Sequence, residues 1–388
     1  MNIIIDNWKD ITDEDIHKVA QYMASSPIGC IDGGEMQKFE ENFAKFIGKK
    51  YAVAYSSGTA ALHAAVSACD CIKGRNIILS EYSYLGAVYA ALENQSKVIL
   101  CPFDEETLTI DTDYIEEMID EDTQAILITH IWGNPCNMDK ISHIREKYGV
   151  RVISDASHAH GAEWKGQKIG GLECEDISCF SLGKGKLITG GELGVAVTDD
   201  EKLYDKLLMI GHPNRVPFAL KGNLFSHYSN GYGIKLRPHI LSMVIGNSQL
   251  EKYPEKMKYN ISTNEYLESC ICEIPGFKKL KQYESSRRVY WKLLIKLDKE
   301  YWKDWTTQYI AKLFTNRGIG LEQFHNYDFG YESDIQFNER YDDLLVNKSN
   351  MSPPDNIIVL PTMVKISHES MENIISVFRE ISELRKKE

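Results

Sequence analysis

No stretch of this 388-residue chain stays apolar for the roughly 20 consecutive residues that a membrane-spanning helix needs. The first ten residues, MNIIIDNWKD, carry acidic side chains where a secretory signal peptide needs basic ones, and their apolar run is short. We therefore expect neither a membrane span nor a signal peptide, and a protein that works in the cytoplasm.

Positive charge is scarce as well. The chain has 44 lysines and arginines against 56 aspartates and glutamates, which gives a formal net charge of −12. This excess of acid argues against nucleic acid or an anionic membrane as the main partner. An anionic small molecule could still bind, but it would need a local group of basic residues.

The Cys-x-x-Cys spacing of many redox and zinc sites is absent. The nine cysteines are scattered, and the shortest spacings are the Cys-x-Cys pairs Cys69/Cys71 and Cys270/Cys272. An odd number of scattered cysteines is typical of reduced thiols. His158 and His160 could form part of a metal site, but the further ligands that a metal requires are missing nearby, so we expect no metal.

Strand and helix patterns alternate over the first 200 residues. This rhythm predicts an α/β fold whose mostly parallel sheet is covered by helices. The expected strands are 51–55, 76–79, 97–102, 125–130, 150–154, 177–181 and 194–198, and the expected helices are 12–24, 35–47, 60–69, 84–93, 111–121 and 139–148.

The pattern loosens after residue 211, and we predict a large domain at residues 1–250 followed by a small α+β domain at residues 251–388. Segment 215–230 is expected to be a loop, and a helix at 240–253 should end at Pro254. The remaining expected elements are strands at 289–297 and 357–360 and helices at 306–316 and 368–387.

Ser57, Gly58 and Thr59 stand between the first expected strand and an alanine-rich helix. Backbone N–H groups and hydroxyls at a helix N-terminus can bind a phosphate, although Ser-Gly-Thr also serves as a plain helix cap. The Gly-Lys-Ser/Thr ending of a nucleoside-triphosphate loop does not follow.

Lys186 lies in the segment CFSLGKGKLITGGELG, between glycines, hydroxyls and apolar residues. Partial burial would lower the pKa of its amine and make it a nucleophile, whereas a lysine in an ordinary surface turn is the alternative. Ser57, Asp155, Ser181 and Lys186 all fall at or just after predicted strand ends. Ligands of parallel sheets bind at that edge, so these residues are candidates for one site.

These motifs, taken in order, resemble the DegT/DnrJ/EryC1/StrS aminotransferases, which are fold type I enzymes dependent on pyridoxal 5′-phosphate (PLP). The resemblance rests on YAVAYSSGTAALHAAV, HIWGNPCNMDKI, VISDASHAHGAEWKGQKIG, CFSLGKGKLITGGELG and GYGIKLRPHILSMVIGNSQL, and it extends over nearly the whole chain. It implies a large domain with a mixed, mostly parallel sheet and a homodimer with active sites at the subunit interface.

The resemblance also implies roles for individual residues. Lys186 matches the Schiff-base lysine, and Asp155 matches the acid that pairs with the cofactor's ring nitrogen. Tyr84 matches the aromatic residue that lies against the ring, and His158 lies where the family has glutamine or histidine near the phenolic oxygen. Lys235 lies near a segment through which the partner subunit contributes to phosphate binding. The expected phosphate cup consists of Ser57, Gly58, Thr59 and Ser181.

The implied reaction transfers an amino group, with glutamate as the expected donor, to a keto sugar. A cyclitol or a sugar acid is an alternative acceptor. A PLP-dependent sugar dehydratase of the same family would lack the lysine, and a non-catalytic PLP-binding sensor would not need both Lys186 and Asp155. We predict an anionic, nucleotide-linked acceptor, because four basic residues follow the lysine segment: Arg215, Lys221, Lys235 and Arg237.

Overall fold

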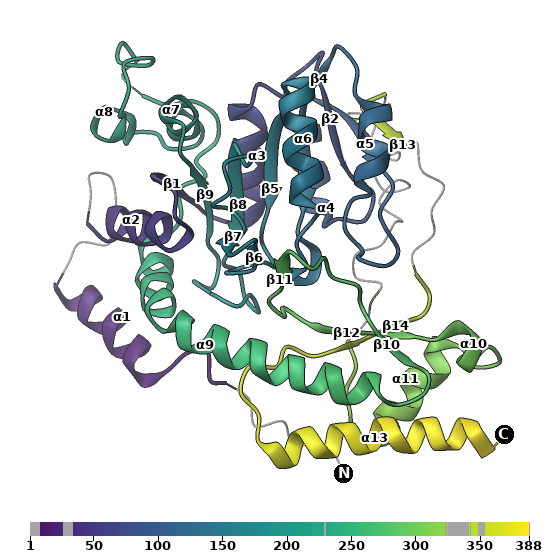
Figure 1. The fold of residues 1–388 in the computed structure, drawn as a ribbon. Coiled ribbons are helices and arrows are strands. Elements are labelled where there is room, and N and C mark those ends of the chain that lie inside the picture. The colour runs from purple at the N-terminus through teal and green to yellow at the C-terminus, as the bar shows by residue number, and fades with distance from the viewer. Residues whose placement is uncertain are drawn as a thin grey trace.

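A computed structural model of the chain describes residues 8–25, 34–228, 230–322, 324, 341, 343–347 and 354–387. Its main sheet has the strand order β1-β9-β8-β5-β4-β2-β3-β13 (Figure 1). Strand β9 runs antiparallel to both neighbours, and the other pairs of this sheet are parallel. The predicted mixed, mostly parallel sheet is thereby confirmed. Its strands are β1 (Tyr51–Tyr55), β2 (Asn76–Ser80), β3 (Lys97–Cys101), β4 (Thr123–Thr129), β5 (Arg151–Asp155), β8 (Ile177–Ser181), β9 (Gly194–Thr198) and β13 (Leu345–Asn347).

Helices cover both faces of this sheet, and the two-residue period of a strand assigns each side chain to one face. In β1, Ala52 and Ala54 belong to one buried cluster, while Val53 and Tyr55 belong to the other. Around the sheet lie α2 (Glu35–Ile47), α3 (Gly58–Ala68), α4 (Leu85–Leu92), α5 (Thr112–Met118), α6 (Met138–Tyr148) and α7 (Glu201–Met209).

Helix α9 (Ile240–Cys272) corrects the prediction that a helix ends at Pro254, because it continues through this proline. An interior proline costs about 3 kcal/mol in a helix. Packing against α1 (Asp13–Ser25) and α2 offsets this cost, and the Nζ atom of Lys252 lies 2.6 Å from a carboxylate oxygen of Asp15 in α1. Sequence alone could not reveal this tertiary support.

A smaller antiparallel sheet, β10 (Phe277–Lys279), β12 (Leu293–Leu297) and β14 (Ile357–Leu360), lies below the main sheet in Figure 1. Its core is shared with α10 (Lys299–Trp302), α11 (Thr307–Asn316) and α13 (His368–Lys387). The strand predicted at 289–297 begins only at Leu293, because Val289 packs in the core of the large part and its N–H donates to the carbonyl oxygen of Gly133. The domain division at 250/251 stays a prediction, since α9 continues across it and β13 joins the main sheet.

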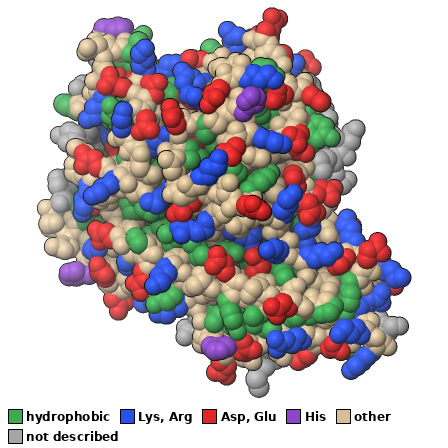
Figure 2. Space-filling model, viewed as in Figure 1, with side chains coloured by type: hydrophobic (Ala, Val, Ile, Leu, Met, Phe, Trp, Pro, Cys, Tyr) green, Lys and Arg blue, Asp and Glu red, His purple; other side chains and the backbone are tan. Residues whose placement is uncertain are grey.

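Short elements complete the described chain: η1 (Ile131–Gly133), the sheet β11-β6-β7 formed by β6 (Glu163–Trp164), β7 (Gln167–Lys168) and β11 (Ser286–Arg287), and α8 (Val216–Ala219). Helix α8 corrects the prediction of a plain loop at 215–230. Within the described ranges, no helix has an apolar stretch sufficient to cross a bilayer. Basic and acidic side chains are interspersed over the face seen in Figure 2.

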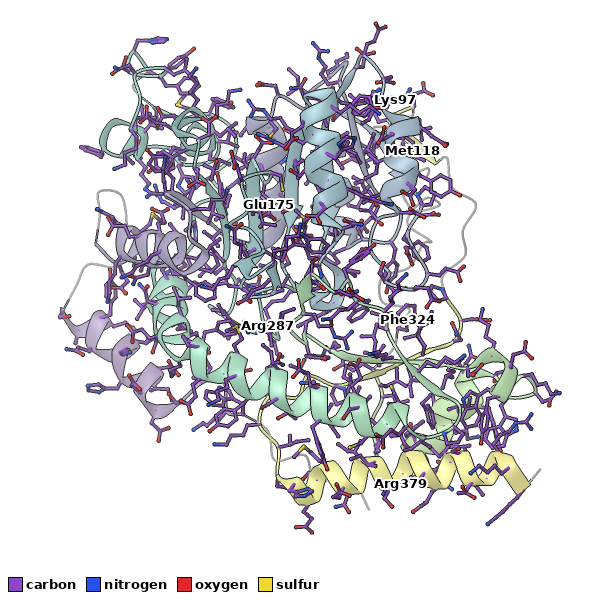
Figure 3. The ribbon with its side chains drawn as sticks, viewed as in Figure 1. Lys97, Met118, Glu175, Arg287, Phe324 and Arg379 are labelled. Carbon is purple, nitrogen blue, oxygen red and sulfur yellow. The ribbon has the colours of Figure 1, made fainter. Side chains whose placement is uncertain are left out.

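An aromatic cluster joins the two parts of the molecule. Trp132 stacks on Trp291 at a centroid distance of 5.2 Å and on Phe324 at 6.1 Å, and its Nε1 donates to the Tyr82 hydroxyl. Phe324 lies between the main sheet and the smaller sheet in Figure 3. The cluster therefore positions the segment before β12 against the carboxyl end of β4.

Candidate active site

A pocket of about 380 Å³ lies at the carboxyl ends of the parallel strands. The structure brings together eight of the nine residues that the sequence assigned to the site, since all eight line this pocket: Ser57, Gly58, Thr59, Tyr84, Asp155, His158, Ser181 and Lys186. The roles assigned to them remain predictions.

The start of α3 forms one end of the pocket. Ser57 caps the helix, and its Oγ accepts a hydrogen bond from Ala60 N at 3.1 Å. A Cβ on Gly58 would lie 2.6 Å from Cβ of Ser181, and one on Gly194 would lie 2.1 Å from the carbonyl oxygen of Ser57. Glycine at both positions therefore lets β8 and β9 approach the helix N-terminus, which is a favourable place for an anion.

Asp155 ends β5 with its side chain buried, and its Oδ1 accepts a hydrogen bond from Ser157 N at 3.0 Å. Lys186 follows β8 and is partly buried. Burial lowers the pKa of its amine to about 8, the positive charge of Lys292 acts in the same direction, and Asp155 opposes both. An amine with this pKa exists in both protonation states near neutral pH, as a nucleophile and proton carrier requires.

His158 is a neutral imidazole in this environment. Its Nδ1 lies 3.2 Å from the backbone nitrogen of Trp132 and accepts that N–H, so the ring proton is on Nε2. Burial, followed by the charge of Lys186, holds the pKa of His158 well below its usual value. His160 is buried beside Phe180 and Tyr253, outside the pocket. Among the described residues, no group of three or more His, Cys, Asp or Glu side chains is arranged to hold a metal ion.

Tyr84 precedes α4 and is about half exposed. A Cβ on Gly86 would lie 2.6 Å from Oγ1 of Thr59 and 2.8 Å from the ring of Tyr84. Gly86 therefore lets the tyrosine ring lie close to the start of α3, where it contributes to the pocket wall.

Sequence reasoning missed several residues of the pocket wall. Trp291 comes from the segment before β12, and no local pattern links it to residues more than 100 positions earlier. Thr129 ends β4, so the rule that placed Asp155 at a strand end could have found it. The other pocket residues without an earlier assignment are Leu62, Ser157, Gly183, Lys184 and Glu192.

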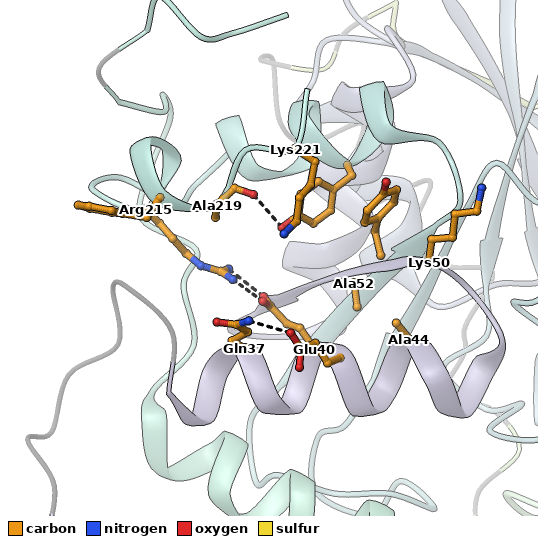
Figure 4. A pocket seen from close by; sticks show the side chains of 12 residues that line it. Gln37, Glu40, Ala44, Lys50, Ala52, Arg215, Ala219 and Lys221 are labelled. Carbon is orange, nitrogen blue, oxygen red and sulfur yellow. Dashed lines mark hydrogen bonds and ion pairs between the residues drawn. The ribbon is translucent and has the colours of Figure 1, made fainter. Parts of the chain in front are cut away.

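The four basic residues expected to serve the acceptor are not gathered in this pocket. Arg215 is buried and ion-paired with Glu40, and with Lys221 it lines a separate pocket of about 420 Å³ between α2 and α8 (Figure 4). Arg237 donates to the carbonyl of Pro213 at 2.9 Å. The prediction that Arg215 is available to a substrate is therefore wrong, because Glu40 already neutralises it.

Lys235 is exposed and does not line the pocket of its own chain. The neighbouring Leu236 accepts a hydrogen bond from Ser56 N at 2.7 Å, which attaches this segment next to the phosphate end of the site. Its expected contact with a partner's cofactor remains a prediction.

The residues of this pocket fit pyridoxal phosphate. The start of α3 with Ser57 and Ser181 would hold the phosphate, and Asp155 would pair with the ring nitrogen. Tyr84 and His158 would flank the ring and its phenolic oxygen. Lys186 would bond the aldehyde carbon, for which its lowered pKa suits it.

Comparison with known proteins identifies the family of this chain. The model of the DegT/DnrJ/EryC1/StrS aminotransferase family matches residues 9–379. An uncharacterized protein of Methanocaldococcus jannaschii, MJ1066, is 36% identical over 200 residues, which are 52% of this chain and 51% of that protein, so the chain matches about half of its length. GDP-perosamine synthase of Vibrio cholerae is 27% identical over 279 residues, which are 70% of this chain and 74% of that protein.

Among solved structures, an aminotransferase from Psychrobacter cryohalolentis has the same fold, with a TM-score of 0.87 and 20% identity over 99% of this chain and 100% of that one. The predicted fold type I architecture is thereby confirmed. The family match confirms the expected class of enzyme and its cofactor. This chain belongs to the DegT/DnrJ/EryC1/StrS aminotransferase family, whose members are pyridoxal-phosphate-dependent enzymes.

Proposed function

We propose that this enzyme moves an amino group from glutamate to the keto group of a nucleotide-linked sugar. Pyridoxal phosphate, when bound, supplies the electron sink for the carbon that loses or gains the amino group. Lys186 carries the proton to and from that carbon, and the carboxylate of Asp155 favours a protonated ring nitrogen. The presence of Lys186 supports amino transfer over sugar dehydration, and both residues together support an enzyme over a sensor.

The observation that carries the choice of acceptor is Lys184. It lines the same pocket as Lys186, is exposed, and has no ion pair with any described residue. In a protein of net charge −12, with both signs interspersed over the surface in Figure 2, a free cation at the pocket offers a local site for a diphosphate. The similarity to a protein named for a GDP-linked product supports the same class of acceptor.

Neutral cyclitols and sugar acids are the competing acceptors. The test compares kcat/KM for a nucleotide-linked keto sugar and a neutral keto cyclitol, each at low and high salt. We expect a preference for the nucleotide sugar that weakens with salt, because screening reduces the attraction of exposed charges. Lys184→Met should raise KM for the nucleotide sugar about three- to tenfold, the scale of one partly exposed charge contact. Lys202→Met, an exposed lysine on α7 outside the pocket, is the control.

A clear preference for the cyclitol that is insensitive to salt would overturn the choice of acceptor and leave the aminotransferase assignment intact. Equal changes of KM for the nucleotide sugar in Lys184→Met and Lys202→Met would show that Lys184 does not bind the acceptor.

We also infer a homodimer. The segment that follows α7 exposes large apolar side chains, including Phe218 at 70%, Tyr232 at 56% and Ile234 at 75%. Such exposure on one segment is typical of a protein interface. Lys235 lies in the same segment. A partner subunit that covers this segment would therefore contact the ammonium group of Lys235. Buried thiols that are free, such as Cys69 and Cys71, support work in the reducing cytoplasm.

A further inference from the structure

Trp291 makes three contacts at the active lysine. Its ring stacks on the imidazole of His158 with centroids 3.7 Å apart and an interplanar angle of 13°. Its Nε1 donates to the carbonyl oxygen of Gly185 at 2.8 Å, and Nζ of Lys186 lies 4.3 Å from its ring centroid. One side chain therefore contacts both the backbone next to Lys186 and the reactive amine itself.

The indole ring packs against the turn at the end of β4. Trp132 stacks on it at 5.2 Å, and Trp132 itself has the positive φ of 58° that a bulky residue seldom adopts. Gly133 must remain glycine, since a Cβ there would lie 2.0 Å from the carbonyl oxygen of Val289. The strained turn at the end of β4 thus fixes the segment that carries Trp291.

The face of an indole ring carries negative charge density and attracts an ammonium group within about 6 Å, and tryptophan is the best of the aromatic residues for this purpose. The contact exists only while Lys186 has a free, protonated amine. In the assigned chemistry, Lys186 would be free of the cofactor during part of each turnover.

We propose that Trp291 is a positioning residue that holds the free ammonium group of Lys186 while the lysine is not bonded to the cofactor. The hydrogen bond to Gly185 fixes the loop, and the ring face keeps the ammonium close to where it must return its proton. The proposal rests on the role given to Lys186 above, and it concerns a residue that no motif of the chain points to.

Several other groups act on the Lys186 amine. Asp155 at the end of β5 favours the charged form, while Lys292 beside Trp291 disfavours it. Lys184 in the same loop and Glu192 also line the pocket, and His158 is neutral. Burial is the largest influence and lowers the amine's pKa to about 8. A cation–π contact must therefore act against burial and raise the pKa.

The test measures the pKa of Lys186 in the cofactor-free protein by trace acetylation across pH, with peptide fragmentation to separate Lys186 from Lys184. Trp291→Leu should lower the pKa of Lys186 by about half to one and a half units, because the ammonium loses its ring contact. Lys292→Met should raise the pKa of Lys186, because it removes a neighbouring positive charge. Exposed Lys184 serves as an internal control and should not change.

The direction of the pKa shift of Lys186 distinguishes a positioning role of Trp291 from simple packing. If Trp291 only excluded water, its removal would expose the amine and raise its pKa, so a raised or unchanged pKa in Trp291→Leu overturns the proposal. Trp291→Phe keeps most of the packing and should give a smaller downward shift, which carries the test if the leucine variant does not fold. Because labelling uses the cofactor-free protein, its outcome is distinct from a failure of the proposed reaction.

Discussion

The rings of His158 and Trp291 lie 3.7 Å apart and almost parallel. One residue follows the central strand β5, and the other belongs to the segment that enters the smaller sheet. Their contact means that the cofactor pocket is completed by both parts of the molecule. The relative placement of those parts therefore affects the reactive lysine directly.

Asp155 offers a test of the electrostatic argument. Asp155→Asn keeps an oxygen that can accept the N–H of Ser157 but removes the negative charge. We expect kcat to fall by roughly 100-fold or more, the scale of one lost electrostatic interaction with developing charge. Steady-state kinetics should show this loss while the thermal midpoint changes little. An enzyme that keeps full activity would mean that another acid serves the ring nitrogen.

The buried pair of Glu40 and Arg215 predicts an effect on stability rather than on substrate binding. Oε1 of Glu40 accepts from Ala54 N and from Nη1 of Arg215, both at 2.8 Å. Arg215→Met leaves the carboxylate of Glu40 buried without its counter-charge. The free energy of unfolding, measured by urea denaturation, should therefore fall by about 3–5 kcal/mol.

The double variant Glu40→Gln/Arg215→Met is the matched control. It removes the unpaired charge but keeps an amide oxygen for Ala54 N, so it should be more stable than Arg215→Met alone. If the double variant were no more stable than the single one, the charge pair would not explain the loss.

Much of the fold could be predicted from sequence because its signals are local. The strand ends at Tyr55, Asp155 and Ser181 follow from apolar runs that stop at polar residues, and they placed most of the pocket. Helix α9 could not be predicted through Pro254, since α1 and α2 supply the packing that offsets the proline. The use of Arg215 was mispredicted because its partner Glu40 lies 175 positions earlier. Trp291 was missed for the same reason, because its contacts His158 and Lys186 lie far from it in the sequence.

Mixed dimers test the expected role of Lys235. Chains with Lys186→Ala and chains with Lys235→Glu should each be inactive alone. In a hybrid, one site combines Lys186 of one chain with Lys235 of the other, so part of the activity should return when the two chains are mixed. Purified hybrids, separated by two affinity tags, provide the measurement. Hybrids without activity would place the role of Lys235 within its own chain, or nowhere in the reaction.

Lys186 is the residue expected to bond the cofactor, and Lys184, two positions earlier in the same loop, is its competitor. The most direct test loads the enzyme with pyridoxal phosphate, reduces it with borohydride and maps the modified peptide by mass spectrometry. We predict the added pyridoxyl mass on Lys186. Its presence on Lys184, or on neither lysine, would mean that Lys186 does not bond the cofactor.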